Sequence, residues 1–359
     1  MDIWGVALEK CEVEEKEIEE ASEVLRQLVE VPTVTGTEAK ASEVLRKPLS
    51  PYVEEFHVDD WFNHIGKLNT GAERKVALVA HIDQIGFMIK SIDDEGFLKI
   101  QQVGGWDASV PYGQRILILG KKGTVLGVIG SVPPHLRKKD QAKEIKIEDL
   151  LVDVGADSKE EVEKLGVEIG NYALLLSDFS KLSGTRVTGM AFDDKAGIAS
   201  IILAAKRVFE RKSELKVELD VVATVQEEIG LRGASMIGYK LRPDATVVVD
   251  VTHAVTPPTK DKVVVKLGKG PAIAVGPIYH PVIVEKLRNV AEKIKSPFQI
   301  EPSPRGTGTD TWAIQVARGG VKTALLSIPL RYMHSGVEVA DLRDIIHTSR
   351  ILAEFVLSF

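Results

Sequence analysis

Residues 76–83 read V-A-L-V-A-H-I-D. Five apolar residues in a row are typical of a strand that is buried on both faces of a sheet. His81 and Asp83 therefore stand where a buried strand leaves the sheet. Three further buried strands are expected along the chain, at Val217–Val225, Ala245–Val251 and Val321–Ile328.

Segments with helical spacing of apolar residues separate these strands. The clearest of them are Glu12–Val31, Ala196–Lys206, Pro281–Lys295 and Asp341–Phe359. Strands that alternate with helices predict an α/β fold, with a mixed, mostly parallel sheet that helices cover on both faces.

Residues 84–180 have a different character. Glycine and valine are frequent there, the expected strands are short, and turn sequences such as Asp93–Gly96 and Gly104–Gly105 are dense. We expect this segment to be a small β-rich domain, inserted into an α/β domain that residues 1–83 and 181–359 form together.

Bulk properties exclude several classes of protein. A chain of 359 residues exceeds the usual size of one core, which favours two domains. The net charge of -6 argues against a general nucleic-acid binder, and the longest apolar runs are far too short to span a membrane. No basic and apolar leader opens the chain, so a cytoplasmic location is expected. The single cysteine, Cys11, excludes a thiolate metal cluster, which leaves histidine and carboxylates as metal ligands.

Five side chains that can bind metals are expected at or just past the ends of the parallel strands. They are His81, Asp193, Glu228, Asp250 and His334. Because such strand ends meet at one edge of an α/β sheet, these side chains should lie close together. Two imidazoles and three carboxylates, one of them shared, can hold two divalent cations.

Two neighbouring carboxylates have other expected tasks. Glu227, beside Glu228, remains free to act as a base. Asp83 is on the same side of the strand as His81, where a carboxylate can accept the second imidazole N–H and fix the tautomer of a ligand. Taken alone, each motif also has a plain structural explanation. The aspartates at 193 and 194 could cap a helix, the two glutamates could be exposed in a loop, and a lone histidine is often structural.

The motifs in combination resemble those of a known family. The sequence contains A-H-I-D-Q-I-G (80–86), D-D-K-A-G (193–197), Q-E-E-I-G-L-R-G-A (226–234), D-V-T-H-A (250–254) and R-Y-M-H-S (331–335). In this order they resemble the tetrahedral, or TET, aminopeptidases, which form family 42 of the metallopeptidases. The resemblance extends over nearly the whole chain.

The resemblance implies a set of roles. One metal would be bound by His81 and Asp250 and the other by Glu228 and His334, with Asp193 as the bridge and a cis peptide between residues 193 and 194. Glu227 would be the general base and Asp83 would orient His81. The metals would be zinc or cobalt, two per subunit. One residue departs from the family, because Gln84 stands where glutamate is usual, which removes one charge near the first metal.

The resemblance also implies an activity and an assembly. The expected activity is removal of N-terminal residues from short peptides by attack of a metal-activated water. The inserted domain would mediate dimerisation, and the dimers would build a hollow homododecamer. Two alternatives stay open, a two-metal deacylase or other amidohydrolase and a cage-forming protein without enzymatic activity.

Overall fold

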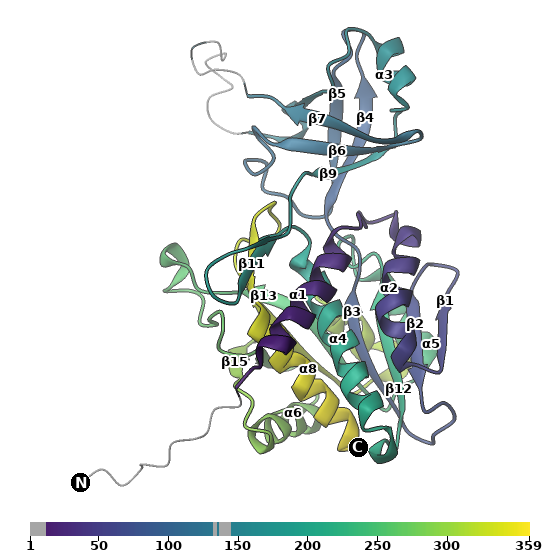
Figure 1. The fold of residues 1–359 in the computed structure, drawn as a ribbon, viewed down its shortest axis with the longest axis vertical. Helices are drawn as coiled ribbons and strands as arrows, with labels where there is room; N and C mark the ends of the chain where they lie inside the picture. Colours follow the sequence, from purple (N-terminus) through teal and green to yellow (C-terminus); the bar gives the residue numbers. More distant parts are fainter. Residues whose placement is uncertain (1–11, 132–134, 136–144) are drawn as a thin grey trace, which may run out of the picture.

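The structure is a computed structural model that describes residues 12–131, 135 and 145–359 (Figure 1). Cys11 therefore lies outside the described residues. Among the residues described, none of the helices combines the length and the apolar character that a membrane span requires.

An eight-stranded mixed sheet forms the larger part of the molecule. Its strands in spatial order are β1 (Glu55–Val58), β2 (His64–Leu68), β12 (Glu218–Thr224), β3 (Lys75–His81), β13 (Ala245–His253), β16 (Thr323–Leu330), β14 (Ala272–Val275) and β15 (Gln299–Pro302). The four central strands β12, β3, β13 and β16 are parallel, whereas β2 and β14 join them in antiparallel orientation. The predicted mixed, mostly parallel α/β sheet is confirmed, and its buried centre is made of the four apolar runs that the sequence indicates.

Helices cover both faces of this sheet. One face packs against α1 (Glu15–Val29), α2 (Ala41–Leu49), α4 (Phe192–Glu210), α6 (Pro281–Lys293) and α8 (Leu342–Leu357). The other face packs against α5 (Arg232–Leu241) and α7 (Thr311–Gln315). Helix α4 lies between the sheet and the outer helices α1 and α8, so all of its first fourteen residues are buried. This burial fixes the start of α4, which carries Asp193, against the sheet.

Six strands close into a small barrel beside the sheet domain (Figure 1). They are β4 (Gly86–Ile92), β5 (Leu98–Val103), β8 (Leu151–Asp153), β7 (Gly123–Ile129), β6 (Arg115–Gly120) and β9 (Tyr172–Leu175), and α3 (Lys159–Leu165) joins β8 to β9. The barrel has an apolar core of its own, built around residues such as Phe87, Ile100 and Ile116. All of these strands lie within residues 84–180, and the limits of the inserted domain stay a prediction.

A three-stranded antiparallel sheet joins the two parts of the molecule. It consists of β10 (Ser180–Lys181), β11 (Arg186–Gly189) and β17 (Glu338–Asp341). The sequence analysis did not predict it, because strands of two and four residues carry little periodic signal. Its strands β11 and β17 lead directly into α4 and α8, so this small sheet holds the first residues of both helices beside the main sheet.

Candidate metal centre

The ends of neighbouring parallel strands bring four acidic or imidazole groups to one edge of the sheet. His81 is the last residue of β3, and Thr224, the last residue of β12, is its partner in the parallel ladder. Asp250 lies two residues beyond Val248 in β13, and Val248 pairs with Val79, two residues before His81. His81 and Asp250 are therefore side by side, and the chain beyond Thr224 brings Glu227 and Glu228 to the same edge.

Asp193 reaches the site by another route. We expected every ligand at or just past the end of a parallel strand, and this expectation is wrong for Asp193, which lies in the first turn of α4 after the short antiparallel strand β11. The peptide between Asp193 and Asp194 is cis, as expected. Asp194 accepts hydrogen bonds from the backbone N–H of His81 at 3.3 Å and of Gly197 at 3.0 Å. The start of α4 is thus tied to the end of β3.

The two oxygens of Asp193 point to two different histidines. Its Oδ1 lies 3.1 Å from Nε2 of His81, and its Oδ2 lies 3.2 Å from Nε2 of His334. Around His81, Nε2 lies 3.9 Å from Oδ1 of Asp250, and around His334, Nε2 lies 3.6 Å from Oε2 of Glu228. Two groups of three potential ligand atoms result, each compact enough for one cation, and Asp193 belongs to both.

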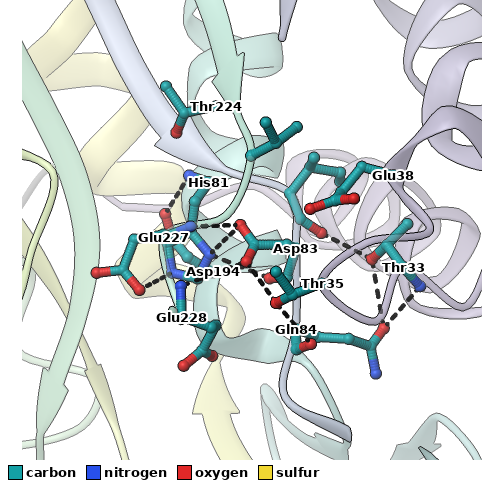
Figure 2. A network of polar contacts seen from close by, with 12 residues as sticks. Thr33, Thr35, Glu38, His81, Asp83, Gln84, Asp194, Thr224, Glu227 and Glu228 are labelled. Carbon is teal, nitrogen blue, oxygen red and sulfur yellow. Dashed lines mark hydrogen bonds and ion pairs between the residues drawn. The ribbon is translucent and has the colours of Figure 1, made fainter. Parts of the chain in front are cut away.

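Asp83 connects His81 to the pair of glutamates (Figure 2). Its backbone carbonyl lies 3.0 Å from Nδ1 of His81, closer than its carboxylate, which is 3.7 Å away. The carboxylate accepts hydrogen bonds from the backbone N–H groups of Glu227 and Glu228 and from the hydroxyl of Thr35. Asp83 therefore contacts the imidazole through its main chain and holds the segment that carries the two glutamates through its side chain.

Glu338 is a residue that the sequence analysis missed. Its buried carboxylate accepts hydrogen bonds from the backbone N–H of Phe192 at 2.7 Å and of His334 at 3.0 Å. It thereby joins the residue before Asp193 to the loop that carries His334. The available signal was an isolated acid in the apolar sequence V-E-V-A (337–340), four residues after His334, which periodicity does not identify as part of a site.

Gln84, the departure from the family pattern, points away from the ligand atoms. Its Oε1 accepts a hydrogen bond from the backbone N–H of Thr33 at 3.2 Å (Figure 2). The same oxygen accepts a hydrogen bond from Nζ of Lys195 at 2.8 Å. Lys195 is fully buried, and burial lowers the pKa of its ammonium to about 7. The amide at position 84 thus satisfies a buried lysine with a neutral partner.

The electrostatics of the site favour the binding of positive charge. Burial raises the pKa of Glu227 to about 11 and that of Asp250 to about 8, although the nearby His81 opposes both shifts. Burial and the charge of Asp193 also raise the pKa of Glu228, and its buried Oε1 has no hydrogen-bond partner among the described residues. Buried carboxylates without donors are costly unless a cation neutralises them, so these residues fit divalent metal ions.

The ligand atoms line a cavity of about 820 Å³. Its walls include Gly105, from the barrel loop between β5 and β6, which lies against the ring of His334. Thr307 to Thr309, in the loop between β15 and α7, also line it. A second cavity of about 930 Å³ extends towards the barrel and shares Gly105, Met333 and His334 with the first.

Comparisons with known proteins agree with this geometry. Residues 63–351 match the model of the M42 glutamyl aminopeptidase family. The chain belongs to the M42 peptidases. It is 39% identical to a lysyl aminopeptidase of Pyrococcus furiosus, over 92% of this chain and 94% of that protein. This chain is therefore a metal-dependent aminopeptidase.

Solved structures show the same fold over almost the whole chain. A TET aminopeptidase from a marine sediment archaeon, Thaumarchaeota archaeon SCGC AB-539-E09, superposes with a TM-score of 0.89 at 31% identity, covering 94% of this chain and 96% of that one. The TET1 peptidase of Pyrococcus horikoshii superposes with a TM-score of 0.82 at 32% identity, covering 94% and 99%, and it can assemble into a tetrahedron or a large octahedral shell. The predicted resemblance to TET aminopeptidases is confirmed.

Proposed function

We propose that the chain binds two divalent cations, zinc or cobalt, and uses them to remove single residues from the free N-terminus of short peptides. The observation that carries this proposal is the position of Asp193, whose two carboxylate oxygens face two separate ligand groups. One site would consist of His81, Asp250 and Asp193, and the other of Glu228, His334 and Asp193. Histidine with carboxylate suits several first-row metals, which is why zinc and cobalt are both proposed.

Glu227 is proposed as the general base. When bound, the two cations polarise the scissile carbonyl and lower the pKa of the attacking water. Oε2 of Glu227 lies 4.0 Å from Nε2 of His81, so its carboxylate borders the ligand cluster without belonging to either ligand group. From there it can accept the proton of the attacking water at a carboxylate oxygen and deliver it to the nitrogen of the leaving amine. Its backbone N–H is held by Asp83, which orients it for this transfer.

We further propose that residues 84–180 mediate dimerisation and that dimers assemble into a homododecamer. The fold shared with the TET1 peptidase of Pyrococcus horikoshii supports self-association. Three large apolar side chains on strands β7 and β8, at positions 126, 128 and 151, are 52%, 44% and 41% exposed. A partner subunit that covers them would remove apolar surface from water. A cytoplasmic location stays a prediction.

The test compares matched peptides that are free or acetylated at the N-terminus. Stepwise release from the free peptides alone, lost with chelator and restored by zinc or cobalt, is the expected result. Faster cleavage of the acetylated series would replace the proposal with a deacylase. Full metal occupancy without cleavage of either series would leave an assembly protein without peptidase activity.

A further inference from the structure

One acidic residue of the cavity has no part in the metal centre or in the proton transfer. Glu301 lies in β15, an edge strand of the main sheet, and it lines the cavity. The hydroxyl of Thr252 donates a hydrogen bond of 2.5 Å to Oε1 of Glu301. Neighbouring Ile300 is 37% exposed, as alternation along a strand requires. Glu301 is therefore held at a defined place in the cavity wall.

Its distance from the metal centre suits a long side chain. Thr252 follows Asp250 by two residues in β13, so both side chains point to the same face, about 7 Å apart along the strand. Glu301 accepts a hydrogen bond from Thr252 and lies farther from Asp250 than Thr252 does. A substrate residue whose backbone is held at the metal centre needs a side chain of several carbons to reach this carboxylate, and lysine and arginine have such stems.

The surroundings fix Glu301 and limit the chemistry that it can meet. Strand β15 is pinned to β14, where Ala274 pairs with Glu301, and the carbonyl of Ser303 approaches Gly276 so closely that a side chain at Gly276 would clash. The aromatic ring of Tyr279, which is 5% exposed, forms part of the same wall. This end of the cavity therefore combines an aromatic ring with one fixed negative charge.

The charges that line the cavity are acidic. Among the described residues that line it there is no lysine or arginine. Asp193, Glu228 and Asp250 would be neutralised by the metals, and Glu227 is engaged in the proton transfer. Glu301 is the remaining carboxylate on the described lining, and it has no cationic partner there.

The two cavities suggest how a peptide lies. They meet at His334 and Met333, and the second cavity leads from there towards the barrel. A peptide whose scissile bond is at the metal centre can extend its remaining residues into the second cavity. The side chain of its first residue then occupies the opposite end of the first cavity, where Glu301 lies.

We propose that Glu301 forms the end of the first-residue pocket and selects peptides that begin with lysine or arginine. This inference deepens the proposed aminopeptidase function and rests on it. A charge-assisted hydrogen bond from the substrate cation to Glu301 supplies the preference. An acidic first residue would instead meet an uncompensated like charge, so it is the least favoured class.

The experiment compares kcat/KM for lysyl, arginyl, leucyl and glutamyl substrates with the same leaving group, in the metal-loaded enzyme. The unmodified enzyme should prefer lysine and arginine. Glu301→Gln should lower the lysine-to-leucine ratio of kcat/KM by about 10- to 100-fold, the range expected for one hydrogen bond to a charged group, because the loss falls mainly on the lysyl substrate. Glu301→Lys should raise the glutamyl-to-lysyl ratio. Glu285→Gln, an exposed acid on α6 outside the cavity, is the matched control and should change no ratio.

Binding of free lysine and free leucine, measured by calorimetry, gives a second readout that needs no turnover. Lysine should bind more tightly, and Glu301→Gln should remove the difference. Thr252→Val keeps the negative charge of Glu301 and removes the hydrogen bond that Thr252 donates to it. This substitution should reduce the lysine preference less than Glu301→Gln does.

Three results would overturn the proposal: an unmodified enzyme that prefers leucine or glutamate, a Glu301→Gln variant that loses lysyl and leucyl activity equally, or equal binding of both amino acids. Failure of the proposed function looks different, because then no unblocked substrate of any class is cleaved.

Discussion

Replacing Glu227 by glutamine is the sharpest test of the reaction that the site performs. The substitution keeps the shape of the side chain and removes its ability to accept a proton. Loss of a general base typically costs about 10²- to 10⁴-fold in rate. At about 1.4 kcal/mol for each factor of ten, this corresponds to an increase of roughly 3 to 5 kcal/mol in the activation free energy. We expect kcat to fall by this amount with little change in KM.

The structure also predicts what this substitution leaves intact. Glu227 belongs to neither ligand group, so the metal content by elemental analysis should stay at the value of the unmodified protein. In the metal-free protein, burial raises the pKa of Glu227 to about 11, so its side chain is protonated at neutral pH. Glutamine mimics that neutral form and avoids the cost of burying an acid. The metal-free variant should therefore be at least as stable as the unmodified protein in chemical denaturation.

Two outcomes would refute this reasoning. A Glu227→Gln enzyme within 10-fold of the original kcat would mean that another group takes the proton. A variant that is inactive because it has lost metal would mean that Glu227 is a ligand. Steady-state kinetics on one unblocked peptide, measured together with metal content, separates these cases.

The remaining predictions concern metal binding, the support of the site and pH. Glu228→Gln should lower the metal content from two ions per chain to one and abolish turnover, and an unchanged metal count would contradict the ligand assignment. Glu338→Ala removes the acceptor of the N–H groups of Phe192 and His334, so metal affinity by competition with a chelator should fall about 10- to 100-fold while the fold, by circular dichroism, is kept. His347 is buried, and burial lowers its pKa to about 4. The unfolded chain therefore binds the extra proton first, and stability should fall by on the order of 3 kcal/mol as the pH drops from 6.5 to 4. His347→Gln should flatten this part of the profile of unfolding free energy against pH, and an unchanged slope would exclude His347 as its source.

The sequence predicts the centre of the fold better than its borders. Strands β3, β12, β13 and β16 are buried on both faces, and their continuous apolar runs make them recognisable. Edge strand β15 alternates between half-buried and exposed residues and contains Pro302, so it resembles a loop in the sequence. Glu301, the residue that we propose as the specificity determinant, was therefore not singled out from sequence.

The residues of the candidate site also differ in how well the sequence locates them. His81, Glu228, Asp250 and His334 could be located because each stands at or shortly after the end of an apolar strand. The position of Asp193 depends on contacts between distant segments, such as the hydrogen bonds that Glu338 accepts from the N–H groups of Phe192 and His334. Such contacts leave no periodic pattern in one sequence. They become visible only when the three-stranded sheet places β17 beside β11.

The contact of the barrel with the cavity has a consequence for protein engineering. Strand β3 ends at His81 and the barrel begins at Gly86, while Gly105 of the barrel lies against His334. The barrel thus adjoins both histidines of the centre. A chimera that exchanges barrels between relatives to alter self-association would also graft part of the cavity wall. Such a swap should be designed with its junctions outside residues 82–86 and 104–106 and should be screened for turnover as well as for assembly.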